Sequence, residues 1–374
     1  MDRVAKLKLL TRAAQYDLCA ACGTQASRVR DEIGQWLYPA LLPDGKRVTL
    51  LKVLQSNLCE NNCLYCGNRR SRDVERSAFS PEELAAAFDE LVRRNRAQGL
   101  FLSSAVWDST SRTMEQMIAT VELVRFKYQF RGYIHLKLLP GCEKAVVERA
   151  VQIADRVSVN LEAPNAERLQ KLSGDKHFTQ DLLQPLQSAK QFHTEGVGAK
   201  AGLTTQFVVG AAGESDLEIL GTVAWLYQEY HLTRAYFSAF QRIPDTPLEN
   251  LPATPPLREH RLYQSDFLLR HYGFSLQDLT FDPKGYLRTD VDPKMAWALR
   301  HPEYFPVEVN RASREQLLRI PGIGPRSAAR ILRARREKTL RDLEDLSALG
   351  IVSKRAAPFI LLNGRRPPQQ LALW

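Results

Sequence analysis

The chain has 374 residues, 44% of them hydrophobic and 25% charged, which excludes a globally disordered protein. No apolar run reaches the roughly 18 residues of a membrane span, and residues 1–18 resemble an amphipathic helix rather than a signal peptide. Six cysteines in so long a chain do not form a disulfide framework, so a clustered set indicates a metal or redox chemistry. The seven histidines are widely spaced, which argues against a histidine-based zinc site.

The net charge of +10 is concentrated near the C-terminus. Residues 309–374 contain fourteen Lys or Arg and five Asp or Glu, a balance of +9, whereas the 38 basic and 37 acidic residues before them nearly cancel. We therefore expect a basic module attached to a nearly neutral body. Nucleic acid is the commonest partner of such a module.

Apolar strands alternate with helices through most of the body. The helix expected at 80–99 has Ser80 as N-cap, Pro81 at its first position and Glu83 completing a capping box. Six alternations predict a parallel α/β sheet or barrel, with functional residues at the carboxyl ends of the strands. The expected strands are 47–57, 99–106, 133–140, 156–163, 202–210 and 234–241, and the other expected helices are 114–128, 143–154, 179–195, 215–230 and 257–273.

Three cysteines follow the first expected strand, in the segment SNLCENNCLYCGNRR (56–70). Cys59, Cys63 and Cys66 have the spacing Cys-x3-Cys-x2-Cys, and an aromatic residue, Tyr65, precedes the last of them. Thiolates hold iron-sulfur clusters, and a closed cubane takes four. Three thiolates would hold three irons and leave the fourth open to another ligand. The alternative is a structural zinc site that takes its fourth ligand from elsewhere.

This motif, its aromatic residue and its position after a strand resemble the signature of the radical S-adenosylmethionine (SAM) superfamily. The resemblance covers about residues 46–245. It implies an α/β fold, a partial (β/α)6 barrel, with a [4Fe-4S] cluster whose open iron binds the amino and carboxylate groups of SAM. In that family an electron from an external donor passes through the cluster and cleaves SAM, and the 5′-deoxyadenosyl radical abstracts a hydrogen atom.

The resemblance also implies cofactor contacts at the strand ends. Ser103 and Ser104 stand where many relatives have a Gly-Gly-Glu-type turn, and their hydroxyl groups could still accept a hydrogen bond from the amino group of SAM. The expected cofactor-binding residues are Tyr65, Ser103, Ser104, Asn160, Glu162 and Gly210.

Other polar residues and cysteines near these positions have two interpretations each. Asn68, Arg69 and Arg70 could meet an anionic substrate, or they could form a solvated basic loop. Gln241 and Arg242 could face the pocket, or they could be a surface pair at the end of a strand. The cysteines Cys19, Cys22 and Cys142 could belong to an auxiliary site, although small buried thiols are the simpler interpretation.

The basic C-terminal segment resembles the helix-hairpin-helix DNA-binding motif. A Pro-Gly-Ile-Gly hairpin at 321–324 precedes a helix whose N-terminal N–H groups favour a phosphate, and arginines at i, i+4 and i+7 form one basic stripe. A weaker copy follows at 343–364. A helical hairpin used for protein contact is the alternative. The expected DNA-binding residues are Gly322, Ile323, Gly324, Arg326, Arg330, Arg333, Lys354 and Arg355.

We therefore predict four parts: an N-terminal helical segment (1–45), the radical SAM barrel (46–245), a proline-rich linker and capping segment (246–308), and an all-α helix-hairpin-helix domain (309–374). Together they are similar to a radical SAM subfamily linked to DNA modification or repair. This resemblance implies a bacterial cytoplasmic protein that needs no membrane. It also implies a possible partner related to uracil-DNA glycosylases.

The leading hypothesis is an enzyme that abstracts a hydrogen atom from DNA. The tail would contact the DNA backbone with little sequence specificity, and the target nucleotide would be flipped, single-stranded or damaged. One alternative is a radical SAM enzyme that modifies RNA. Another is a redox-sensing DNA-binding protein, whose iron-sulfur cluster tunes affinity without turnover.

Overall fold

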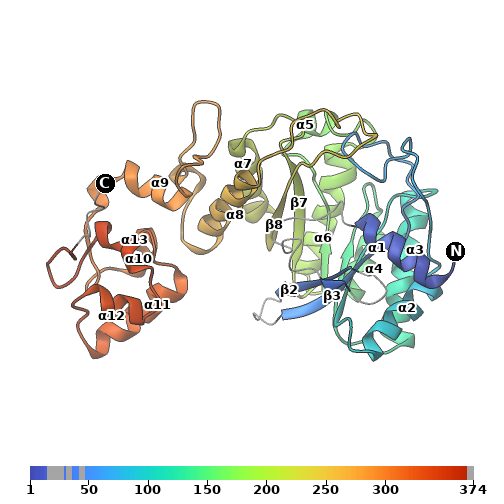
Figure 1. Cartoon of the computed structure of the whole chain (residues 1–374). Coiled ribbons are helices and arrows are strands. Elements are labelled where there is room, and N and C mark those ends of the chain that lie inside the picture. The colour runs from blue at the N-terminus through green and yellow to red at the C-terminus, as the bar shows by residue number, and fades with distance from the viewer. Residues whose placement is uncertain (15–28, 31–35, 42–46, 369–374) are drawn as a thin grey trace. The chain divides into compact units, whose positions relative to one another are not determined.

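The computed structural model describes residues 1–14, 29–30, 36–41 and 47–368. It contains two compact units (Figure 1). The first comprises Met1–Glu214 with Trp225–Glu259, and the second comprises Ser215–Ala224 with His260–Trp374. The segment 246–308, which we expected to form a linker, is thus divided between the two units.

The first unit is built on one sheet whose strands follow chain order, β1 to β8. All neighbouring pairs from β3 to β8 are parallel. The six predicted strands are therefore confirmed, and they form the predicted partial barrel. The strands are β1 (Val29–Arg30), β2 (Trp36–Leu41), β3 (Arg47–Leu54), β4 (Gly99–Ser103), β5 (Tyr133–Lys137), β6 (Arg156–Ser158), β7 (Leu203–Val209) and β8 (Arg234–Ala239).

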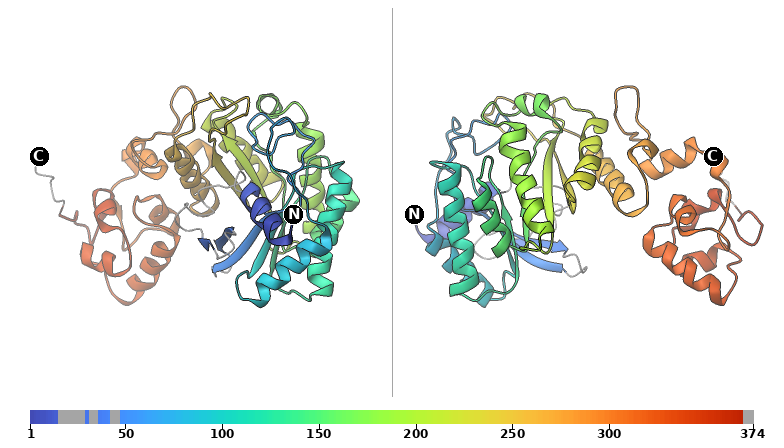
Figure 2. Two further views of the ribbon diagram at one scale, coloured as in Figure 1. Left: turned by 45° about the vertical axis from the view of Figure 1, so that its right-hand side comes forward. Right: turned by 180° about the vertical axis from the view of Figure 1, so that it is seen from behind.

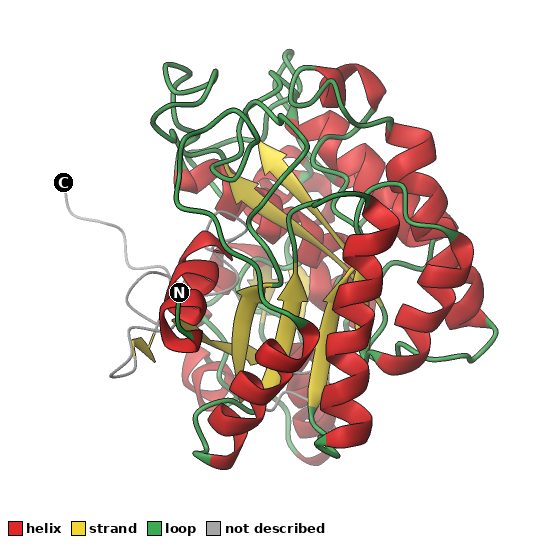
Figure 3. Ribbon diagram, turned by 90° about the vertical axis from the view of Figure 1, so that its right-hand side faces the viewer, coloured by secondary structure: helices red, strands yellow, loops and turns green. Residues whose placement is uncertain are grey.

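Helices pack along the outside of these strands (Figure 3), as the two views of Figure 2 also show. The predicted capping box is present, because Ser80 Oγ accepts from the Glu83 N–H and Glu83 Oε2 accepts from the Ser80 N–H. Phe88, Leu100 and Met117 are almost fully buried between helices and sheet. The helices are α1 (Arg3–Ala13), α2 (Pro81–Arg93), α3 (Thr110–Glu122), α4 (Lys144–Ile153), α5 (Ala166–Gln170), α6 (Gln184–Thr194), α7 (Asp216–Glu229) and α8 (Pro256–His271).

The N-terminal segment differs from the helical expectation. It begins with α1, but β1 and β2 then extend the sheet, and β2 runs antiparallel to β3. Pro39 lies within β2, and proline is confined to strand positions that need no N–H donor. Pro39 therefore makes this segment look unlike a strand in the sequence. None of the helices in the described ranges is long and apolar enough to cross a membrane.

The second unit contains the basic segment. Leu317, Ile320, Ile323 and Ile331 form the centre of its buried cluster. A two-residue parallel pairing of β9 (Val307–Glu308) with β10 (Ile360–Leu361) joins the two ends of this otherwise helical module. Its helices are α9 (Pro293–Arg300), α10 (Arg314–Arg319), α11 (Pro325–Glu337), α12 (Leu343–Ala348) and α13 (Ser353–Ala356).

Helix α9 is attached to both hairpins of this module. The buried Lys294 ammonium donates to the Ile323 carbonyl oxygen at 2.5 Å and lies 4.8 Å from the Tyr272 ring. Burial lowers the pKa of Lys294 to about 7. Asp292 forms an ion pair with Arg355 of the second hairpin. The segment before residue 309 therefore belongs structurally to the helix-hairpin-helix module.

Replacing Gly322 with alanine should destabilise this module strongly. Gly322 has φ +87°, and a Cβ atom there would lie 2.8 Å from the backbone oxygen of Val352. The left-handed conformation alone costs an alanine about 1–2 kcal/mol, and the backbone clash adds to this cost. Gly364→Ala is the matched control, because Gly364 has φ +76° but open space around it. Hydrogen exchange of α10 and α11 in the full chain should rise more for Gly322→Ala, and equal effects would contradict the packing explanation.

Candidate active site and nucleic-acid interface

A cavity of about 530 Å³ lies at the carboxyl ends of the parallel strands. Strand-end residues from β3 to β8 contribute to its wall, as the parallel sheet predicts. Its volume lies within the range of about 300–1,000 Å³ that is usual for small-molecule sites.

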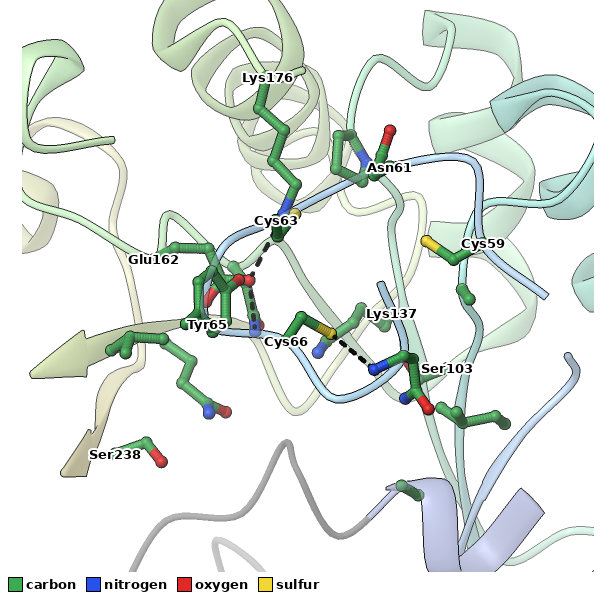
Figure 4. Close-up of a pocket in the computed structure, with 18 of the residues that line it drawn as sticks. Cys59, Asn61, Cys63, Tyr65, Cys66, Ser103, Lys137, Glu162, Lys176 and Ser238 are labelled. Carbon is green, nitrogen blue, oxygen red and sulfur yellow. Dashed lines mark hydrogen bonds and ion pairs between the residues drawn. The ribbon is translucent and has the colours of Figure 1, made fainter. Parts of the chain in front are cut away.

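The three cysteines of the 56–70 segment line this cavity (Figure 4). The Cys63 thiol donates to Ser173 Oγ at 3.3 Å, and the Asn68 N–H donates to the Cys66 sulfur at 3.4 Å. A backbone hydrogen bond from Leu64 to Leu172, at 2.8 Å, fixes the middle of the loop. The loop therefore presents its sulfur atoms to the cavity from a fixed backbone.

Arg76 closes the cysteine loop. Its guanidinium donates four hydrogen bonds of 2.5 to 2.9 Å, all to backbone carbonyl oxygens. A planar guanidinium has donors in a rigid fork, so one side chain can satisfy several carbonyl groups that would otherwise lack partners. We regard Arg76 as a positioning residue for the cysteines. The carbonyl groups belong to Asn57, Asn68, Arg69 and Arg72.

Burial keeps two of the thiols protonated in the metal-free site. Burial raises the pKa of Cys66 to about 12 and also raises the pKa of Cys59. Without a metal these two thiols keep their protons, and coordination would displace them. Within the described ranges, no three His, Cys, Asp or Glu side chains are arranged to hold a single metal ion. Each iron of a cubane needs only one thiolate, so a cluster does not require the three sulfur atoms to meet at one ion.

A buried lysine lies beside the thiols. Lys176 Nζ is 3.8 Å from Glu162 Oε1, and both side chains are about nine-tenths buried. Burial by itself would lower the pKa of Lys176, but the nearby Cys63 sulfur and the Glu162 carboxylate outweigh burial and raise it. Burial, followed by the nearby Glu162 carboxylate, raises the pKa of Tyr65 well above its usual range. The ammonium therefore stays charged between thiol and carboxylate (Figure 4).

Five of the six expected cofactor-binding residues line the cavity. The exception is Gly210, whose φ of +94° and missing Cβ are explained by packing, since a Cβ atom would lie 2.0 Å from Thr254 Oγ1. Its N–H also donates to Glu214. The five residues that line the cavity are Tyr65, Ser103, Ser104, Asn160 and Glu162.

The structure also shows where the polar residues and cysteines with two possible interpretations lie. Gln241 and Arg242 line the cavity. Arg69 is buried and donates to Asn62 Oδ1, so it supports the loop, whereas Arg70 is exposed. Cys142 is buried and does not line the cavity. Cys19 and Cys22 lie outside the described residues.

Sequence reasoning missed several residues of the cavity. Lys176 lies in a loop with no motif around it, and only the fold brings it to the thiols. Lys137, Gln206 and Ser238 belong to strands, where their polarity could have been noticed as unusual for a buried parallel sheet. The missed polar residues are Lys137, Lys176, Gln206, Ser238 and Glu259.

The first hairpin of the second unit has the geometry that the sequence suggested. Gly322 has the left-handed conformation, Ile323 is buried, and Gly324 is the N-cap of α11 with φ −104°. A Cβ atom at Gly324 would lie 3.0 Å from the Tyr272 hydroxyl oxygen, so a larger residue there would need the end of the tyrosine side chain to shift by a few tenths of an ångström. The N-terminus of α11 follows directly, where an anion is favoured.

The basic side chains of the two hairpins are not equivalent. Arg326, Arg330 and Arg333 are exposed on α11, but Arg330 also donates to the Leu349 carbonyl oxygen at 3.0 Å. Arg355 is engaged by Asp292, while Lys354 is exposed. The first hairpin therefore offers more charge to a partner than the second.

Comparisons with known proteins give two family matches. Residues 53–226 match the radical SAM superfamily, and residues 304–354 match the helix-hairpin-helix motif. No curated protein matches the sequence.

Three solved structures illustrate the similarity of fold. The hydrogenase maturase HydG from Carboxydothermus hydrogenoformans is 14% identical, with a TM-score of 0.48 over 59% of this chain and 51% of HydG. Methylornithine synthase (PylB) is 18% identical, with a TM-score of 0.49 over 60% of this chain and 63% of that protein. The methyltransferase TsrM from Kitasatospora setae is 13% identical, with a TM-score of 0.41 over 54% of this chain and 36% of TsrM.

The two family matches agree with the parallel half-barrel and with the hairpins described above. The chain thus contains a radical SAM superfamily domain followed by a helix-hairpin-helix motif, and the first of these supports an enzyme whose reaction is unassigned.

Proposed function

We propose that this enzyme uses radical SAM chemistry to modify or repair DNA. The observation that carries the proposal is the placement of three cysteine thiols on one wall of a cavity at the carboxyl end of the partial barrel. The basic second unit, with its helix-hairpin-helix motif, supports nucleic acid as the substrate.

Cys59, Cys63 and Cys66 would hold a [4Fe-4S] cluster. The donor set fits this group: buried thiols on one fixed loop, a backbone N–H directed at a sulfur, and the Lys176 ammonium offsetting negative charge. When bound, the cluster and SAM supply a 5′-deoxyadenosyl radical that abstracts a hydrogen atom. The chain itself would orient the cofactor and exclude water, and the contacts to SAM would come from Tyr65, Ser103, Ser104, Asn160 and Glu162.

DNA would be held through its phosphates. The N-terminus of α11 and the exposed Arg326 and Arg333 provide N–H groups and positive charge. Contacts of this kind position a duplex but read little sequence. A sugar or base edge inside a duplex is hidden, so the target nucleotide would have to be flipped out or single-stranded.

Further parts of the proposal rest on resemblance alone. The combination of barrel and hairpins resembles the subfamily linked to DNA modification or repair. From this resemblance we also propose a cytoplasmic location, an external electron donor and a partner related to uracil-DNA glycosylases.

Cys63→Ala should abolish formation of 5′-deoxyadenosine, because the cluster would lose one of its three thiolates. The protein would be reconstituted without oxygen with iron and sulfide, and the product measured by mass spectrometry after adding SAM and dithionite, with and without DNA. Cys142→Ala is the matched control, because it removes a buried thiol outside the cavity. Absence of product from wild-type protein that carries its cluster would contradict turnover and favour the redox-sensor alternative.

The double variant Arg326→Glu/Arg333→Glu should weaken binding to a short DNA duplex and flatten its salt dependence. Each lost phosphate contact should reduce the log–log salt slope by about 0.9. We leave Arg330 unchanged because its contact with Leu349 supports the fold. Lys200→Glu, at an exposed position of the first unit, makes the same charge change as each single substitution and serves as a control. An unchanged slope would contradict the interface, and stronger competition by tRNA than by duplex would favour the RNA alternative.

Arg76→Lys should make the reconstituted protein lose iron to a chelator about 10-fold faster or more, because lysine keeps the charge but not the fork of donors. The metal-free protein should also be cleaved more readily by proteases between residues 57 and 76. Arg70→Lys, an exposed neighbour, is the control. Equal iron loss and equal cleavage in the two variants would show that Arg76 does not position the loop.

A further inference from the structure

The side chain of Gln206 is the most informative unexplained group in the cavity. It lies on β7, is 9% exposed and lines the cavity wall. Its side-chain amide makes no hydrogen bond to any part of the chain that the structure describes, although the backbone oxygen of Gln206 accepts from the Glu162 N–H at 3.0 Å. The amide atoms are not enclosed by the described part of the chain but face the cavity, so a ligand or water there can supply their hydrogen-bond partners.

The surroundings of Gln206 indicate the chemistry of a ligand. An amide presents a donor and an acceptor side by side, which is the arrangement that pairs with the edge of a nucleobase. Val208 and Phe240 add apolar wall to the same cavity, and Ser238 adds a hydroxyl group from the neighbouring strand β8. Flat apolar surface together with a few placed polar groups is how a flipped base is held.

Positively charged side chains line the same cavity. Lys137 ends β5 and lines the wall, and Arg242 follows β8. Figure 4 shows Lys137 beside Cys66, in the middle of the cavity, and Ser238 on the side away from Cys59. A cation at the end of a strand can pair with a phosphate, which a free nucleoside lacks.

We propose that Gln206 reads the edge of a nucleobase, with Lys137 holding the phosphate of the same nucleotide. This subsite would hold the target nucleotide of DNA, and it rests on the proposed function. Gln206 is a specificity-determining residue in this account.

The test uses the full-length protein with a saturating amount of S-adenosylhomocysteine, so that the SAM region is filled. The probes are the four deoxynucleoside monophosphates and the matching nucleosides, and binding is followed by saturation-transfer NMR. At least one monophosphate should bind the wild-type protein. Gln206→Leu should weaken that binding about 5- to 10-fold, as expected for the loss of one hydrogen bond to a buried amide.

Three comparisons make this result specific. Lys137→Met should weaken binding of the monophosphate but not of its nucleoside. Gln191→Leu, at an exposed position of α6, should change neither, and thermal melting should show all variants to be folded. Affinity for S-adenosylhomocysteine should stay within about twofold of wild type in Gln206→Leu.

Two outcomes would overturn the inference. One is that none of the monophosphates binds at concentrations up to about 10 mM. The other is that Gln206→Leu weakens S-adenosylhomocysteine as much as the nucleotide, which would assign the amide to SAM. If DNA still binds and 5′-deoxyadenosine still forms, the proposed function survives either outcome. Loss of DNA binding by the wild-type protein itself would instead remove the proposed function and this inference together.

Discussion

The conformation of the cysteine loop depends on Arg76, an arginine that does not itself line the cavity. Residues 57 to 76 contain no helix or strand, so their backbone carbonyl groups cannot be satisfied by regular structure. Arg76 donates to four of these carbonyls, and the side chain of Asn57 bonds to both Glu75 and Ser77. These hydrogen bonds hold the irregular backbone of the cysteine loop in one conformation.

Charge in the cavity follows from the same arrangement. A buried thiol resists ionisation unless positive charge is near, and burial raises the pKa of Cys66 to about 12. Lys176 brings one cation to them, and Glu162 holds that cation in place. Buried pairs of this kind stay charged because each partner compensates the other. Lys176 and Glu162 thus make one part of the cavity wall polar and suited to a charged cofactor, and apolar residues form other parts of the wall.

The second unit shows how two similar hairpins acquire different roles. At the start of helix α9, Lys294 donates to the Ile323 carbonyl oxygen of the first hairpin, and Asp292 forms an ion pair with Arg355 of the second. The charge of Arg355 is therefore paired within the module. The two hairpins approach each other closely at Gly322. A Cβ atom there would lie 2.8 Å from the backbone oxygen of Val352, so no side chain fits. Packing within the module therefore selects which positive charges remain available on α11.

Local sequence determined much of this protein. The six parallel strands, the capping box at Ser80 and the two hairpins follow from apolar periodicity, caps and glycines, and each of these acts over a few residues. The cysteine spacing predicted the cysteine loop for the same reason, and this loop lines the cavity. Strand β2 was missed because Pro39 breaks its pattern. Only the tertiary structure decided that Lys176 meets Cys63, that Gly210 packs against Thr254, and that Gln206 faces the cavity. Those contacts join residues far apart in the chain, and no local pattern encodes which distant side chain a fold brings near.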